Sequence, residues 1–129
     1  MTDNTTSVAE LHFDHEVWTY ELKFWREELK IFEKYLSKID DKKLTKEATS
    51  ELEHFQNQFI HHKKVVHDLI HEASSNEKFL VHNNDIWASD EVKKVKLEEH
   101  GSLEEQMHTA RKIYVELKSD FRNWLANRL

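Results

Sequence analysis

Apolar residues recur at alternating steps of three and four along the first third of the chain. The series is Val8, Leu11, His15, Trp18, Leu22, Trp25, Leu29, Phe32, Leu36 and Ile39. This heptad pattern is typical of a helix that buries one seam against other helices. Ser7, followed three residues later by Glu10, matches the capping box that opens a helix. We therefore predict a first helix from Ser7 to a polar turn at 40–43.

The second helix is expected to begin near Leu44 or Thr45. Its seam is Ala48, Leu52, Phe55, Phe59, His62, Val66, Leu69 and Ala73. Short polar residues at 74–76 compete for backbone hydrogen bonds, so the helix either frays there or continues to about Val81. A second polar turn is expected at 83–85.

The third helix is expected to open at Ser89. Its seam is His100, Leu103, Met107, Ala110, Tyr114, Leu117, Phe121 and Trp124. Gly101 could divide this segment into a short helix and a long one, but the continuous pattern favours a single helix. Because both turns are short, consecutive helices should be antiparallel neighbours. The prediction is an all-α, antiparallel three-helix bundle forming one domain over residues 1–129, with a short fourth helix before Gly101 as the alternative.

The first helix carries a second apolar line. Phe13, Val17, Tyr20, Phe24 and Ile31 fall within an arc of roughly 60°, nearly opposite the seam. The side of a bundle helix opposite the seam is normally charged, so another segment is expected to pack over this apolar line. A second copy of the chain, another protein's helix, or residues 74–88 folded back over it could supply that segment.

Ten histidines are the other unusual feature. If the first turn is centred near residue 42 and the second near residue 85, one set of side chains comes level at one end of the bundle. The set is His12, His15, Glu72, His100 and Glu104. Imidazoles with carboxylates suit zinc or iron. The alternative is that these histidines are hydrogen-bonded core residues, as we expect for His62.

Short histidine motifs resemble those of known metal proteins. The order His12-x3-Glu16, His67-x3-His71 and then His100 is similar to part of the hemerythrin pattern of non-haem di-iron bundles, although a fourth helix with His-x4-Asp is absent. The Glu-x-x-His spacing of ferritin-like di-iron proteins occurs at Glu51/His54 and Glu105/His108. These resemblances imply iron as the cofactor.

A broader resemblance covers most of the chain. Residues 54–59, the aromatic first helix and the segment 117–125 together resemble small all-helical cytosolic proteins of bacteria. That resemblance implies the helical fold and brings no activity with it.

Composition excludes several functional classes. With no cysteine and one glycine, the chain offers neither thiol catalysis nor a phosphate-binding loop. A formal charge of −6 without a basic stripe argues against nucleic acid. No run approaches the roughly 20 apolar residues of a membrane span, and residues 1–9 are polar, so a cytoplasmic location is expected.

The sequence favours a non-enzymatic bundle that self-associates, or binds another protein, through the first helix. Binding of iron or zinc at the histidines is the alternative. A third hypothesis is a pH-responsive oligomer that changes between about pH 7.5 and 5.5, around the ordinary histidine pKa.

Overall fold

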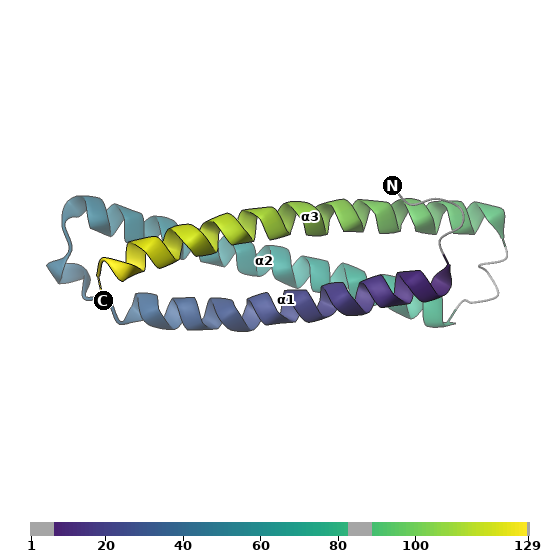
Figure 1. Ribbon diagram of the computed structural model, residues 1–129, viewed down its shortest axis with the longest axis horizontal. Helices are drawn as coiled ribbons and strands as arrows, with labels where there is room; N and C mark the ends of the chain where they lie inside the picture. The colour runs from purple at the N-terminus through teal and green to yellow at the C-terminus, as the bar shows by residue number, and fades with distance from the viewer. Residues whose placement is uncertain (1–6, 83–88, 129) are drawn as a thin grey trace.

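The computed structural model describes residues 7–82 and 89–128, which form an elongated bundle of three long helices (Figure 1). The helices are α1 (Val8–Ser37), α2 (Lys46–His82) and α3 (Asp90–Ala126). A short 3₁₀ helix, Asp41–Lys43, lies between α1 and α2. Helices α1 and α3 run in the same direction and α2 runs in the opposite one. The predicted all-α three-helix bundle is confirmed.

Side-chain caps fix where the first two helices begin. The Ser7 hydroxyl accepts a hydrogen bond from the Glu10 amide at 3.2 Å, and the Thr45 hydroxyl accepts one from the Ala48 amide at 3.1 Å. Each cap satisfies an amide that has no partner within the helix. Helix α3 follows Ser89 without such a side-chain bond.

Neither weak point in the pattern interrupts a helix. Helix α2 continues through the polar residues 74–76 to His82. Helix α3 passes through Gly101, whose φ is not positive, so this glycine acts as an ordinary helical residue. The alternative of a short separate helix before Gly101 is wrong. Seam residues on both sides of it, such as Leu97 and Leu103, are buried, and their packing outweighs the weak helix propensity of glycine.

The three seams meet in one long core. Every seam residue predicted for α2 and α3 is buried. Rings from all three helices pack at its centre, with Phe121 4.9 Å from Phe59 and 5.3 Å from Phe32, measured between ring centroids. Full burial of such a side chain stabilises the fold by about 1.5–3 kcal/mol. Outer faces are polar enough that no described helix has the apolar length to cross a membrane.

The alignment of α2 along the bundle differs from the expected one. His12 contacts Glu77, five positions beyond the expected Glu72, which is about 8 Å along a helix. Residues 38–45 extend past the end of α1 before the chain reverses, so α2 begins beyond that end (Figure 1). This displacement of α2 affects both of its neighbours and leaves the alignment of α1 with α3 as expected, with His15 beside His100.

Candidate functional site

The second apolar line of α1 lies on the outside of the bundle. Its exposed fractions are 65 % for Phe13, 45 % for Val17, 76 % for Tyr20, 54 % for Phe24 and 53 % for Ile31. Helices α2 and α3 cover only the seam side of α1, so these side chains face away from the core. We call these five residues the α1 stripe. Exposed apolar residues are ordinary singly, but a contiguous line of them is unusual on the surface of a monomeric protein.

Ion pairs hold α1 in one rotation against α3. The Arg111 guanidinium donates two hydrogen bonds to Glu21, at 2.7 and 2.8 Å. Glu28 accepts from Lys118 at 2.7 Å and from the Tyr114 hydroxyl at 2.6 Å. The bond to Glu21 raises the pKa of Arg111, and burial together with the bond to Glu28 raises that of Tyr114. These contacts fix which side of α1 faces outward.

The histidines gather at the end of the bundle where α1 begins. His12 Nδ1 and His15 Nδ1 lie 2.6 and 2.9 Å from the two carboxylate oxygens of Glu77. His100 Nε2 lies 2.9 Å from Asp14. The ring centroids of His15 and His100 are 5.2 Å apart. Three imidazoles therefore share two carboxylates at the boundary of the core.

Burial favours the neutral form of His15. It lowers the pKa of His15, and the nearby His100 lowers it further against the opposing effect of Glu77. Burial alone would raise the pKa of Glu77, but the hydrogen bonds from His15 and His12 outweigh it and lower that pKa. A neutral His15 that donates a hydrogen bond to an ionised Glu77 agrees with the lowered pKa of both groups. His15 Nε2 and His100 Nδ1 are buried and have no hydrogen-bond partner in the described chain.

The predicted metal ligands come together in part. His12, His15 and His100 gather as expected, but the carboxylates that contact them are Glu77 and Asp14. Of the other two predicted ligands, Glu72 is half-buried and Glu104 is exposed. Within residues 7–82 and 89–128, no group of three or more histidine and acidic residues forms an arrangement suited to a metal ion. Metal binding stays a prediction.

Asp14 and Glu77 were not identified from the sequence as the carboxylates that contact the histidines. The spacing of Asp14 along α1 could have indicated its contact. Asp14, Glu21 and Glu28 are spaced by seven residues along α1, and each one contacts α3. Acids at heptad spacing beside a seam commonly pair with a neighbouring helix. Glu77 left no such signal, since its contact depends on the displacement of α2.

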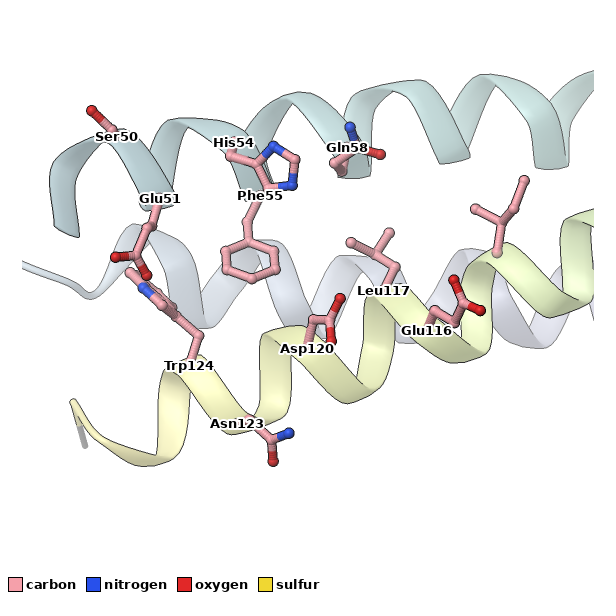
Figure 2. Close-up of a pocket in the computed structure, with 11 residues that line it drawn as sticks. Ser50, Glu51, His54, Phe55, Gln58, Glu116, Leu117, Asp120, Asn123 and Trp124 are labelled. Atoms are coloured by element: carbon pink, nitrogen blue, oxygen red, sulfur yellow. The ribbon is translucent and has the colours of Figure 1, made fainter. Parts of the chain in front are cut away.

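A groove lies between α2 and α3 near the C-terminal end of α3. It encloses about 670 Å³. Figure 2 shows Phe55 and Trp124 within it, with His54 on α2 and Glu116 and Asp120 on α3. The predicted Glu51/His54 pair lines this groove, whereas Glu105/His108 lines a separate hollow beside Trp18. The two ferritin-like pairs therefore do not share a site.

His62 occupies the middle of the core, as a structural histidine. Its ring stacks on Tyr114 at 4.8 Å between centroids and lies 5.8 Å from Trp25. Burial lowers the pKa of His62 to about 4. The folded state therefore holds this imidazole neutral over a pH range in which the unfolded chain protonates it.

The carboxylate contacts predict unequal effects at two neighbouring acids. Glu77→Gln removes the charge shared by His12 and His15, and we expect it to lower the free energy of unfolding by about 1 kcal/mol. Glu72→Gln is the matched control and should change it by less than about 0.5 kcal/mol. Urea unfolding at pH 7.5 measures both. Equal effects of the two variants would contradict the observed alignment of α2.

The lowered pKa of His62 predicts acid sensitivity. Because the unfolded state binds the proton more tightly, stability is fully present above pH 6.5 and falls as the pH drops toward 4. The loss attributable to His62 reaches at most about 3 kcal/mol. Urea unfolding between pH 7.5 and 4.5 should show a steeper loss for the wild type than for His62→Phe. Parallel curves for the two proteins would show that His62 does not contribute.

Comparison with known proteins does not assign the chain to a family. No family model matches it, and neither a curated protein nor a solved structure does so. Functional inference therefore rests on the contacts and exposed surfaces of the chain itself.

Proposed function

We propose that this protein acts through protein–protein contact, as a self-associating helical bundle whose interface is the α1 stripe. The observation that carries the proposal is the exposure of five apolar side chains in one line, three of them aromatic. Removing such surface from water is the main driving force of protein association. Aromatic residues are also enriched at the centres of interfaces.

The way α1 is held supports a contact with a second copy. The bonds from Arg111 to Glu21 and from Lys118 to Glu28 already fix the rotation of α1. Little ordering is then needed on binding, which favours affinity. A second copy presents the same stripe, so a two-fold symmetric contact places apolar surface against apolar surface on both sides.

A non-enzymatic role is part of the proposal. Two titratable core groups, His15 and His62, are closed off by packing, with exposed fractions of 3 % and 2 %. The hollow that His15 lines has a volume of about 10 Å³, which is too small to admit a substrate for proton transfer. We also place this function in the cytoplasm, since a chain without cysteine gains no disulfide from an oxidising compartment.

The proposal predicts that a charge on the stripe separates the copies. Phe24→Glu should convert a dimer into a monomer, because a carboxylate would have to be buried in an apolar contact. Sedimentation velocity over a range of protein concentrations measures the change. Since Phe24 is 54 % exposed, the helical circular dichroism and thermal unfolding of the monomer should stay close to those of the wild type.

Val115→Glu on α3 is the matched control. Val115 is similarly exposed, at 60 %, and lies outside the stripe, so this variant should remain a dimer. A wild-type protein that stays monomeric at the highest concentrations would contradict the proposal. Equal loss of dimer in both variants would show that the contact does not involve the stripe.

Metal binding at the histidine end is the second candidate. It is supported by the unpartnered nitrogens His15 Nε2 and His100 Nδ1, because the opposite nitrogen of each ring contacts a carboxylate. Metal-binding histidines usually have such a carboxylate behind them.

Native mass spectrometry with added zinc or iron(II) tests this candidate. Metal at whole-number stoichiometry in the wild type, lost in His100→Ala but retained in His108→Ala, is the expected result. His108 is an exposed histidine of the same helix and serves as the control. Absence of uptake by the wild type, or equal uptake by all three proteins, would reject the site.

A further inference from the structure

One charged residue, Glu27, interrupts the apolar α1 stripe, and it distinguishes parallel from antiparallel pairing of two copies. Phe13, Val17, Tyr20 and Phe24 follow steps of four and three, and the next position is Glu27, ahead of Ile31. In a parallel pair each residue meets its own copy, so two Glu27 carboxylates would face each other within the apolar line. Like charges at this distance repel, and removal of water strengthens the repulsion. A parallel pair is therefore disfavoured.

The two flanks of the stripe differ in their charge. On the side toward α3, Asp14, Glu21 and Glu28 already contact His100, Arg111 and Lys118. By helical periodicity the opposite flank consists of Glu16, Lys23 and Lys30, all of them exposed. This flank is acidic near the start of α1 and basic further along. When two copies pack side by side, only an antiparallel arrangement places the acidic part of this flank in one copy beside the basic part of the same flank in the other copy.

We infer that the occupant of the α1 stripe is a second copy of this chain, packed antiparallel, with the two-fold axis crossing the stripe at the level of Leu22 along the helix; this rests on the proposed function. Phe13 then lies beside Ile31 of the second copy, and Tyr20 lies beside Phe24 of the second copy. Glu27 lies opposite Val17 of the second copy, away from its own equivalent. Each of these contacts occurs twice.

The charged flank supports the same register. Glu16 lies beside Lys30 of the second copy, again twice, while the two Lys23 side chains lie near the axis and extend into water. Lys30 now contacts Glu27 one turn back, at 3.1 Å, in an exposed pair that contributes little. Apolar contact supplies most of the affinity of this dimer, and the flank selects its direction.

Cysteine cross-linking tests the direction directly, because the chain has no cysteine of its own. A mixture of Phe13→Cys and Ile31→Cys proteins should give a covalent dimer of the two variants with a short bis-maleimide. Phe13→Cys alone should give a many-fold lower yield of covalent dimer, because the two cysteines at position 13 would lie about 27 Å apart along the helices. Ile31→Cys alone should behave in the same way.

The outcomes separate the direction from the proposed function. Cross-linking of Phe13→Cys with itself, or no cross-link in any mixture while sedimentation still shows a dimer, overturns the antiparallel register and leaves self-association standing. A wild-type monomer with no cross-link in any mixture overturns both.

Charge reversal gives a second readout without new cysteines. Glu16→Lys and Lys30→Glu should each raise the Kd of the dimer several-fold, since each places like charges side by side. The double variant Glu16→Lys/Lys30→Glu should return to within about twofold of the wild type. Additive weakening in the double variant would contradict the pairing, because these exposed changes leave the core of each bundle unaltered.

Discussion

The packing of three heptad seams around one axis determines the rest of this structure. Each helix contributes one line of side chains, and the large rings of Phe59, Phe121 and Trp25 fill the space between them. In a three-helix bundle, each helix turns one side toward the core and its two neighbours. The opposite side of each helix remains uncovered. Any further apolar residue on α1 must therefore lie at the surface.

This constraint makes the second line of α1 informative. The acids at positions 14, 21 and 28 pair with α3 and lock the rotation of α1. Their contacts hold the stripe outward and keep Glu16 and Lys30 on the opposite flank. The bundle thus presents an exposed apolar line with charges along one edge, and the proposed antiparallel second copy would complement both features.

Features that depend on local periodicity were predictable from the sequence. The buried seam residues of all three helices and the outward direction of Phe13 to Ile31 follow from steps of three and four. Passage of α3 through Gly101 was favoured on the same grounds. The cap at Ser7 follows from its spacing to Glu10.

The alignment of helices along the axis was not predictable in this way. It depends on how far residues 38–45 extend before the chain reverses, and no periodic pattern encodes that length. The error placed Glu72 where Glu77 lies, and so changed the carboxylate at the histidine end. Neighbouring seams accept such a shift because one heptad layer resembles the next.

Burial of the stripe between two copies is the central claim, and hydroxyl-radical footprinting at increasing protein concentration measures it most directly. Oxidation of Phe13, Tyr20 and Phe24 should fall as the concentration rises, while oxidation of the exposed Ile60 and Val115 stays constant. Oxidation of the stripe that is unchanged at every concentration, or protection spread equally over all five residues, would contradict the account.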